Sequence, residues 1–574
     1  MNTLLGLLGM ALAWIFYGGT IVGLGALFLG LTHRRVLLSF SCCFWIGLAL
    51  LVTALQLVNL VFGINLFIVR FICILGLFSF WLFRARLDVS FWPRLTAWYK
   101  VLFALVIVWI ADRALEGPWV VDSGLYHFNS VRWANEQPLP PGLGNLHGRL
   151  AFNQSYFLFV SFVNLLPKRG DGHNFANSLL LVFTIITILE KSTEITRDRA
   201  RKTILLLLLP LVFFFALLFN HTNAPGISSP SPDIALLCLQ FAMFCFALAI
   251  WDRDSPEAKE RQAVEVIGIL LLSGLAVTFK LSSIVFCAGI AIFAIVLYLL
   301  TPERKGAIFS SLVTLLLLGF TWVTRSIIAS GYLIYPMVAT GCPVSWKVPP
   351  EQVRLEANWV LSWAREPFVD WSKVLSDWSW LWPWLNRETG RPDFILALSF
   401  LGFAGLLLVI LFVASPNRAM KGLRRCSHFL ALAGVCTAAF CFWFFTAPDP
   451  RFLGAIFMLL PLCLLGIALE VTESDSRFLL AVTVSTAILG FGVYLALSAN
   501  GLGLLRIERT RIGSRIPIAK LVQKVTKSGL PVWAPADGSL TWDAPLPATP
   551  YFRRDLQLRG KDLGSGFCLG TRPH

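Results

Sequence analysis

The sequence has few charged residues for its length. Only 14% of its 574 residues are Asp, Glu, Lys or Arg, whereas 57% are hydrophobic. The mean hydropathy of +0.72 is too high for a soluble domain of this size. The alternation of polar and apolar residues that marks membrane β-strands is also lacking, and only helices or closed barrels can cross a bilayer. The sequence therefore predicts an all-α polytopic membrane protein.

Several signatures of soluble enzymes are absent as well. There is no Gly-rich phosphate loop, no Ser/His/Asp nucleophile set and no zinc motif, which disfavours a cytoplasmic nucleotide-sugar enzyme. The twelve cysteines show no ligand spacing, and we interpret them as packing residues. Lys and Arg outnumber Asp and Glu by 48 to 32, but they cluster in short loops, so no nucleic-acid partner is expected.

Apolar runs that approach the ~20 residues of a helical span are frequent. They predict spans at 4–31, 36–62, 66–83, 97–111, 175–190, 203–219, 233–251, 263–279, 282–300, 307–324, 393–413, 428–446, 452–470 and 479–498. A further run, Tyr156–Leu166, is too short to cross and predicts an interfacial or re-entrant helix.

The distribution of basic residues predicts the topology. Cytoplasmic loops carry an excess of Lys and Arg, which assigns to that side His33–Arg35, Arg84–Arg94, Lys191–Lys202, Arg253–Arg261, Arg304–Lys305 and Arg418–Arg425. The opposite face then carries the loops 112–174, 220–232 and 325–392 and the tail 499–574. The tail is expected to form a small extracytoplasmic module with a strand and turn at 532–540.

The loop 112–174 holds the most informative stretch of the chain, a polar island at 121–136 in an otherwise largely apolar sequence. Asp122 follows the apolar run Val101–Ile110 closely, so it is expected just outside a membrane face. A carboxylate fixed there among hydrogen-bond donors suits chemistry on a polar substrate carried by a lipid. The surrounding candidates for substrate binding are Tyr126, His127, Arg132, Asn145, His147 and Arg149.

Five further polar residues and one tyrosine fall at the same predicted face: Asp233, Lys280, Arg325, Tyr335, Asp449 and Arg451. Each has a plain structural alternative. Asp233 follows Pro232 and could cap a helix, Lys280 could extend its amine to the membrane surface, and Arg451 could pair locally with Asp449. Acids beside cations could also bind a phosphate and activate a hydroxyl.

The loop 325–392 is rich in tryptophan. An aromatic belt at the membrane interface explains this composition. A platform on which sugar rings stack is the alternative. The tryptophans are Trp346, Trp359, Trp363, Trp371, Trp378, Trp380, Trp382 and Trp384.

The order of these elements resembles that of the C-type (GT-C) membrane glycosyltransferases. By this resemblance Asp122 is the acid of the first outer loop, and Asp233 is the second acid. Leu125–Glu136 and Tyr156–Leu166 would be the two jaw helices. The resemblance divides the chain into extra N-terminal spans at 1–96, a catalytic core at 97–498 and the C-terminal module at 499–574.

The chain resembles more closely a group of uncharacterised bacterial membrane proteins. The shared motifs are Asp-Ser-Gly-Leu-Tyr-His at 122–127, Pro-Gly-Leu-Gly-Asn-Leu-His-Gly-Arg at 141–149, Ser-Pro-Ser-Pro-Asp at 229–233, Pro-Asp-Pro-Arg-Phe at 448–452 and Trp-Asp-Ala-Pro-Leu-Pro at 542–547. Members of the group carry cysteines on either side of the last motif, where this chain has Thr541 and Ala548.

The GT-C resemblance implies a membrane glycosyltransferase. It would move a sugar from a polyprenyl-phosphate donor to a hydroxyl of a glycan or lipid acceptor, at the outer face of a bacterial inner membrane. Asp122 would be the base, and Asp233 would position the acceptor or share a Mg²⁺ or Mn²⁺ ion with Asp122. Lys280, Arg325 and Arg451 would hold the phosphate, and His127 and His147 would bind metal or sugar.

Two other classes stay open. An O-antigen-type polymerase or ligase would move whole lipid-linked glycans and would also use arginines at the outer face. A transporter or flippase would favour internal repeats and charges near the bilayer midplane, and the sequence shows neither.

Overall fold

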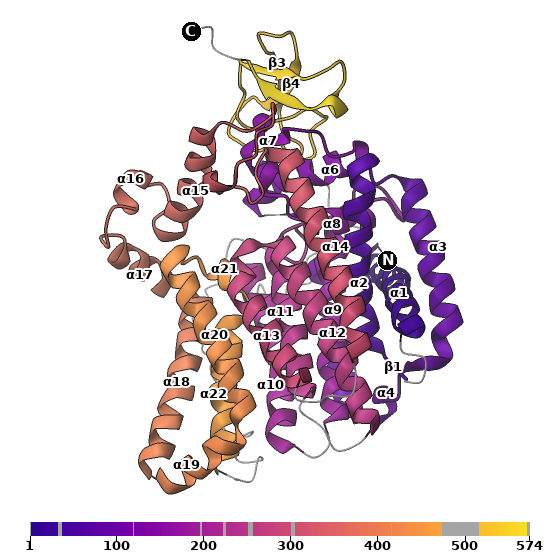
Figure 1. The fold of residues 1–574 in the computed structure, drawn as a ribbon, viewed down its shortest axis with the longest axis vertical. Helices are drawn as coiled ribbons and strands as arrows, with labels where there is room; N and C mark the ends of the chain where they lie inside the picture. The colour runs from indigo at the N-terminus through magenta and orange to yellow at the C-terminus, as the bar shows by residue number, and fades with distance from the viewer. Residues whose placement is uncertain are drawn as a thin grey trace.

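Long apolar helices make up most of the chain in the computed structural model (Figure 1). The structure describes residues 2–32, 37–118, 120–195, 198–221, 226–250, 256–299, 305–414, 416–472 and 516–570. Each predicted span from 4–31 to 452–470 overlaps one long helix for most of its length, and the span predicted at 479–498 lies outside the described residues. These helices are α1 (Asn2–Thr32), α2 (Phe40–Val61), α3 (Leu66–Phe83), α5 (Ala97–Ala114), α9 (Gly172–Glu194), α10 (Arg199–His221), α11 (Pro232–Ala249), α12 (Pro256–Phe279), α13 (Ile284–Leu299), α14 (Lys305–Ser330), α18 (Pro392–Ala414), α20 (Ser427–Thr446) and α22 (Ile456–Thr472).

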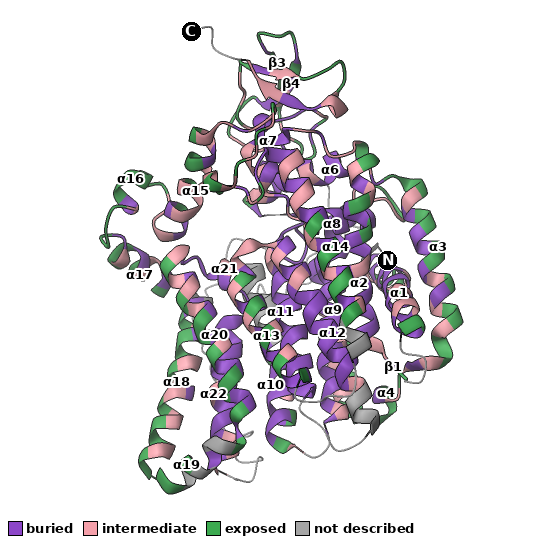
Figure 2. Cartoon of the chain, viewed as in Figure 1, coloured by how far each residue is buried: buried purple, intermediate pink, exposed green. Residues whose placement is uncertain are grey.

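Ten of the described helical segments are long and apolar enough to cross a membrane. A bundle of such helices is the architecture of a multi-pass membrane protein. Figure 2 shows exposed residues along the outer sides of α3 and α18. Many of these are large and apolar, including Phe67 and Phe78 on α3 and Leu406 and Val413 on α18. Contiguous apolar surface of this kind suits contact with lipid rather than water.

Capping residues set the start of several helices. The Ser39 side chain accepts a hydrogen bond from the Cys42 amide at 3.2 Å where α2 begins. Asn65 does the same for the Ile68 amide at 3.1 Å where α3 begins. Side-chain oxygens at this position satisfy amides that have no partner within the helix. These local signals explain why the helices begin within a few residues of the predicted edges.

Glycines allow α1, α2 and α3 to pack backbone against backbone. A Cβ atom on Gly47 of α2 would collide with the Ile21 carbonyl oxygen of α1, and one on Gly23 of α1 would collide with the Gly76 carbonyl oxygen of α3. Small residues at such crossings are typical of helices packed in membranes. The helix α2 also packs against α12 and α14, so the N-terminal helices join the rest of the bundle.

The two ends of the bundle differ in character. A short parallel pair, β1 (Leu38–Ser39) with β2 (Leu87–Asp88), brings the start of α2 and the segment after α3 together at one end. This segment includes η1 (Arg84–Arg86) and α4 (Phe91–Arg94). In Figure 1 the basic helix α19 (Pro416–Arg425) lies at the same end, and the C-terminal module lies at the other. The arrangement agrees with basic loops that share one face.

Short helices cover the end that carries the module. The first group is η2 (Ser123–His127), α6 (Phe128–Glu136), α7 (Leu143–Leu146), η3 (Gly148–Phe152) and α8 (Tyr156–Val163). The two helices predicted at Leu125–Glu136 and Tyr156–Leu166 are therefore present. The second of them, α8, is buried along its whole length, because it packs against α2, α6 and α9. It does not cross the bundle, as its length predicted.

A second group of short elements follows the long helices α12, α14 and α20. It comprises η4 (Leu281–Ser283), η5 (Val338–Thr340), α15 (Pro350–Arg365), α16 (Trp371–Val374), α17 (Leu381–Thr389) and α21 (Pro450–Leu453). Arg325 was expected at the start of the outer loop 325–392, and this placement is wrong, because Arg325 lies within α14. The helix α14 continues to Ser330 and stops before Gly331. The φ of Gly331 is 82°, a left-handed conformation that glycine adopts readily because it has no β-carbon.

The C-terminal module contains two antiparallel hairpins. The strand β3 (Leu521–Val525) pairs with β4 (Pro531–Pro535), and β5 (Leu556–Leu558) pairs with β6 (Phe567–Leu569), with the 3₁₀ turn η7 (Leu563–Ser565) before β6. The strand predicted near Val532 is confirmed by β4. The part of the predicted module at 499–515 lies outside the described residues.

We predict that Gly47→Ala destabilises the bundle. The added methyl group would force α1 and α2 apart, and overpacking of this kind costs about 1–3 kcal/mol. The thermal unfolding midpoint of the purified protein in detergent should fall by several degrees. Gly434→Ala in α20 is the matched control, because its Cβ would meet nothing within 4 Å. A midpoint as high for Gly47→Ala as for the control would contradict this packing.

Candidate functional site

Asp122 stands at the point where the chain leaves α5 and begins the short helices of the outer end. It directly precedes the π-helical turn η2, which continues into α6. Single π-helical turns of this kind occur often at functional sites. Position and turn together hold the Asp122 carboxylate at the end of the bundle.

Two arginines from distant parts of the chain face the Asp122 carboxylate. Arg149 Nη1, from η3, lies 2.9 Å from Asp122 Oδ1. Arg451 Nη1, from α21, lies 3.8 Å from Asp122 Oδ2. All three side chains are about one-quarter exposed, so solvent and small molecules can reach them. The fold thus brings the sequence motifs at 122–127, 141–149 and 448–452 together around one carboxylate.

Two more acids extend this group of charges. Arg149 Nε lies 3.4 Å from Glu356 Oε1 on α15. Arg451 Nη2 lies 3.2 Å from Asp449 Oδ2, and the Arg451 amide donates to Asp449 Oδ1 at 3.0 Å. Local pairing of Arg451 with Asp449 is therefore present, but it does not exclude contact with Asp122. Carboxylate and guanidinium groups alternate along a row of five residues, which are Glu356, Arg149, Asp122, Arg451 and Asp449.

Asp233 and Lys280 form an ion pair beside this row. Ser231 accepts a hydrogen bond from the Asp233 amide and caps α11, and its hydroxyl donates to Asp233 Oδ2 at 3.3 Å, while Lys280 pairs with Asp233 Oδ1. The Lys280 amine also lies 4.2 Å from the centre of the Phe452 ring, next to Arg451 in the sequence. Lys280 therefore connects the motif at 229–233 with the motif at 448–452.

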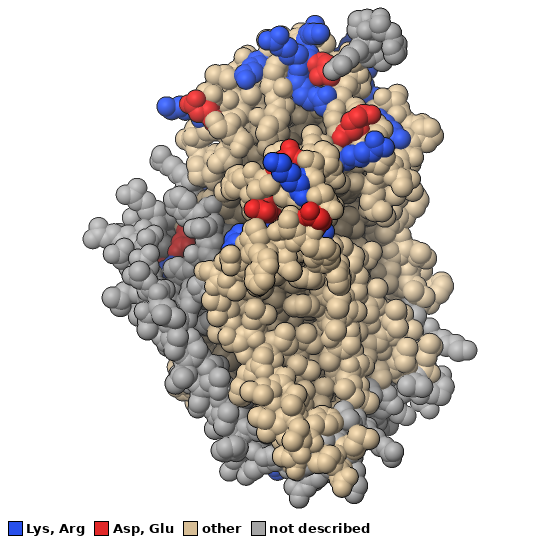
Figure 3. All heavy atoms as spheres, turned by 90° about the vertical axis from the view of Figure 1, so that its left-hand side faces the viewer, with Lys and Arg blue, Asp and Glu red and all other residues tan. Residues whose placement is uncertain are grey.

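Charged side chains gather on this part of the molecular surface. Figure 3 shows acidic and basic side chains in the upper part of the face it draws, above a broad band with almost none. Charges are costly in hydrocarbon, so the uncharged band matches the membrane-embedded part of the protein. The charged part matches the membrane surface and what lies beyond it.

The arginines decide the protonation of Asp122. Burial alone would raise its pKa, but the positive charges of Arg149 and Arg451 outweigh burial and hold the pKa below its usual range. The same balance, with Arg451 as the main cation, lowers the pKa of Asp449 to about 2. Both carboxyl groups are therefore ionised at neutral pH.

The two predicted histidines are buried and neutral. Burial lowers the pKa of His127 to about 4 and that of His147 to about 3, because the charged ring is poorly solvated there. The Tyr126 ring lies between them, with centroids 4.4 Å from His127 and 6.5 Å from His147. The Arg149 guanidinium lies 5.8 Å from the Tyr126 ring centre. Tyr126 thus lies beside both histidines and Arg149.

A divalent cation at Asp122 and Asp233 would compete with the protein's own cations. Asp122 faces two arginines, and Asp233 is paired with Lys280. Among the described residues, a different set has the spacing of metal ligands: Asp198, His428 and Glu470. There the Arg201 guanidinium already donates to Asp198 at 2.6 Å. At Asp122 and at Asp233, a metal ion would therefore have to displace a cationic side chain.

Three of the predicted binding residues hold the structure of the outer end together. Arg132 bonds Glu136 at 3.0 Å and the Asp543 carbonyl of the module at 2.9 Å. The Asn145 amide donates to the carbonyls of Trp346 and Phe567. Tyr335 is buried beside Gly148, with its hydroxyl 3.0 Å from where a Cβ would stand.

Of the three cations predicted to hold the phosphate (Lys280, Arg325 and Arg451), Arg325 is the one that the structure places elsewhere. Its side chain lines a separate pocket, where it bonds Asn59 and Asn153 rather than an acid. It therefore does not join Lys280 and Arg451, although all three were expected to hold one phosphate.

Two contributors to the site were not predicted. Glu356 lies in a loop whose tryptophans dominate its composition, and no local pattern distinguishes it. Trp542 of the module covers Gly124, where a Cβ would lie 2.8 Å from the indole ring. The amides of Thr541 and Trp542 both donate to the Gly124 carbonyl at 2.8 Å. The module thus clamps the turn that follows Asp122.

The buried histidines predict loss of stability in acid. The unfolded chain takes up protons near the usual histidine pKa of ~6.5, whereas folded His127 does so only near 4. The histidines therefore do not lower the free energy of unfolding above pH 6.5. As the pH drops toward 4, the free energy of unfolding falls by on the order of 2 kcal/mol for each histidine. Unfolding midpoints of the wild type and the double variant His127→Gln/His147→Gln should be measured between pH 7 and 4.5. Equal losses in both proteins would contradict this origin.

Comparison with known proteins gives a family but no characterised relative. A family model described as a domain of unknown function, DUF8201, matches residues 7–458. No curated protein and no solved structure matches the chain. The matched region contains every charged residue of the row from Glu356 to Asp449 and the pair Asp233 and Lys280. The chain belongs to the DUF8201 family.

Proposed function

We propose that this protein is a membrane glycosyltransferase of GT-C type. It moves a sugar from a polyprenyl-phosphate donor to a hydroxyl of a glycan or lipid acceptor, at the outer face of the bacterial cytoplasmic membrane. One observation carries the proposal: the Asp122 carboxylate is held between Arg149 and Arg451 at the charged end of a membrane-type bundle. A base next to cations is what transfer from a phosphate requires.

The reaction assigns a role to each charge. The acceptor oxygen forms a bond to the anomeric carbon while the bond from that carbon to the donor phosphate breaks. The acceptor proton goes to the Asp122 carboxylate, and the electron pair leaves with the phosphate. Arg451 and Arg149 stabilise the leaving phosphate, because guanidinium groups bind phosphate oxygens through two parallel hydrogen bonds. The pair Asp233 and Lys280 orients the acceptor.

Substrate binding would also activate the base. In the free protein the arginines lower the pKa of Asp122, which makes the carboxylate a weak base. A donor phosphate that takes over Arg451 withdraws that stabilisation and adds a negative charge nearby. Both effects raise the pKa of Asp122. The carboxylate would thus become a competent base when the donor is in place.

The tryptophan-rich segment suits a place at the membrane surface. The helix α17 ends at Thr389, three residues before the spanning helix α18 begins. Trp378 packs against Phe444 and Phe445 at the end of α20 and is exposed on its other side. An interfacial belt explains these contacts. The exposed rings also remain available to a sugar chain, so the segment could guide the acceptor.

We predict that Asp122→Asn abolishes sugar transfer. Loss of a general base typically lowers rates by about 10²–10⁴-fold. The assay uses proteoliposomes with radiolabelled polyprenyl-phosphate sugars. Asp537→Asn, on the exposed surface of the module, is the matched control and should be fully active. Equal transfer by Asp122→Asn and the control would remove Asp122 from the mechanism. Transfer only from donors that carry whole glycans would favour a polymerase or ligase.

Arg451→Gln should shift the pH dependence of transfer. Without this cation the pKa of Asp122 rises, so the base is protonated at a higher pH and the acid limb of the rate profile moves upward. The rate at the optimum should also fall, by about 10²-fold or more, because the phosphate loses a stabilising contact. A lower rate with an unmoved acid limb would show that Arg451 does not act on Asp122.

A further inference from the structure

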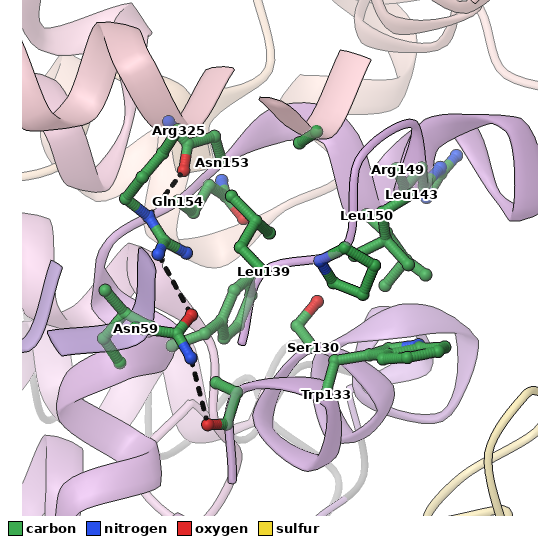
Figure 4. A pocket seen from close by; sticks show the side chains of 15 residues that line it. Asn59, Ser130, Trp133, Leu139, Leu143, Arg149, Leu150, Asn153, Gln154 and Arg325 are labelled. Atoms are coloured by element: carbon green, nitrogen blue, oxygen red, sulfur yellow. Dashed lines mark hydrogen bonds between the residues drawn. The ribbon is translucent and has the colours of Figure 1, made fainter. Parts of the chain in front are cut away.

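A small pocket lies under the short helices, and Arg149 is the one residue of the row around Asp122 that lines it. It opens between α2, α6, α8 and α14, and its volume is about 40 Å³ (Figure 4). Its polar lining includes Asn59, Asn153, Gln154 and Arg325, and its apolar lining includes Leu139 and Phe157. A space of this size holds a few waters or one small anionic group.

Arg325 is buried in this pocket, with 6% of its surface exposed. Its Nε donates to Asn153 Oδ1 at 3.3 Å, and its Nη1 donates to Asn59 Oδ1 at 3.0 Å. Both acceptors are neutral amides, and no carboxylate pairs with Arg325 among the residues that the structure describes. A buried cation without a counter-ion is costly, because nothing replaces the water it has lost.

The surrounding contacts fix this cation in place. The Asn59 amide donates to the carbonyls of Ala134 and Gln137, at 3.3 and 3.1 Å. The Asn153 amide donates to the Trp322 carbonyl at 2.7 Å. Each asparagine therefore has only its oxygen left for Arg325. The guanidinium uses two of its five N–H groups in these bonds, so the others remain for a ligand.

Two more polar atoms around the pocket lack partners. Within the described part of the chain, Gln154 Oε1 and Trp133 Nε1 are buried without a hydrogen bond, and both residues line the pocket. Buried polar atoms are nearly always paired in folded proteins, so unpaired ones indicate a missing ligand or water. The cavity thus has an acceptor on Gln154, an indole donor on Trp133 and a cation on Arg325. Together they suit a ligand group that carries both anionic oxygens and a hydroxyl.

The geometry points to a second anion site, in which Arg325 binds the oxygens of a phosphate monoester and Gln154 accepts a hydrogen bond from a protonated oxygen. Arg149 lies between this site and Asp122. It is one of the residues that line the pocket, and its guanidinium group bonds the Asp122 carboxylate. The phosphate comes from a lipid carrier or from solution. Binding here does not require sugar transfer, so the site and the proposed reaction are tested separately.

The test measures ligand-induced stabilisation of the full-length protein in nanodiscs. One arm adds inorganic phosphate, and the other places polyprenyl phosphate in the bilayer. A ligand that binds only the folded state raises the unfolding midpoint. We expect an increase of several degrees in at least one arm for the wild type. A rise with polyprenyl phosphate alone identifies a lipid phosphate, and a rise with both identifies the phosphate group itself. No rise in either arm overturns the site.

Variants assign the effect to Arg325. Arg325→Gln should lose the ligand-induced rise, with at least a tenfold weaker apparent affinity. Arg354→Gln is the matched control, because Arg354 is exposed on α15 at the same end, and it should keep the rise. A rise that persists in Arg325→Gln refutes the assignment.

Gln154→Glu keeps the test decisive if Arg325→Gln does not fold. The new carboxylate would serve as an internal counter-ion for Arg325. It should raise the midpoint without ligand and remove the response to ligand. A protein that still responds as the wild type does would also refute the site.

Discussion

The high cost of an ion in hydrocarbon determines where this protein can carry clustered charges. The bundle presents apolar side chains outward on α3 and α18, and the charges around Asp122 and Asp233 collect at one end. There each acid faces a cation: Asp122 faces Arg149 and Arg451, and Asp233 faces Lys280. Pairing offsets the cost of placing these charges next to the membrane. Under the proposed function, a substrate phosphate would exchange with an existing partner instead of meeting an uncompensated charge.

Partner exchange gives the Asp122 site a simple logic. Arg451 is shared between Asp449 and Asp122, at 3.2 and 3.8 Å. Asp449 keeps the arginine in place whether or not Asp122 uses it. The longer distance is the contact that a donor phosphate would replace. Under the proposed function, one cation thus links donor binding to the basicity of Asp122.

The scaffold behind the site comes from both ends of the chain. The N-terminal helix α2 supplies Asn59, which bonds Arg325 and two carbonyls at the C-terminal end of α6, those of Ala134 and Gln137. The C-terminal module holds Gly124 and bonds Asn129 through Thr541. The Thr541 hydroxyl accepts this bond and so joins the module to α6. The sequence-based division assigned residues 1–96 and 499–574 to parts outside the core. Both parts nevertheless contribute to the outer end of the core.

Composition and periodicity determined the class and most helix positions, because a membrane span needs a long apolar run whatever its neighbours are. Local motifs also identified Asp122, Asp233, Lys280, Arg149 and Arg451 as candidates, because polar residues at the ends of apolar runs are conspicuous. Only the tertiary structure decided which of them meet. Glu356 reaches Arg149 through a helix in a loop without a charge pattern, and Arg325 turns toward two amides because α14 continues to Gly331. Contacts between distant segments depend on how helices pack, and a linear sequence does not state that packing.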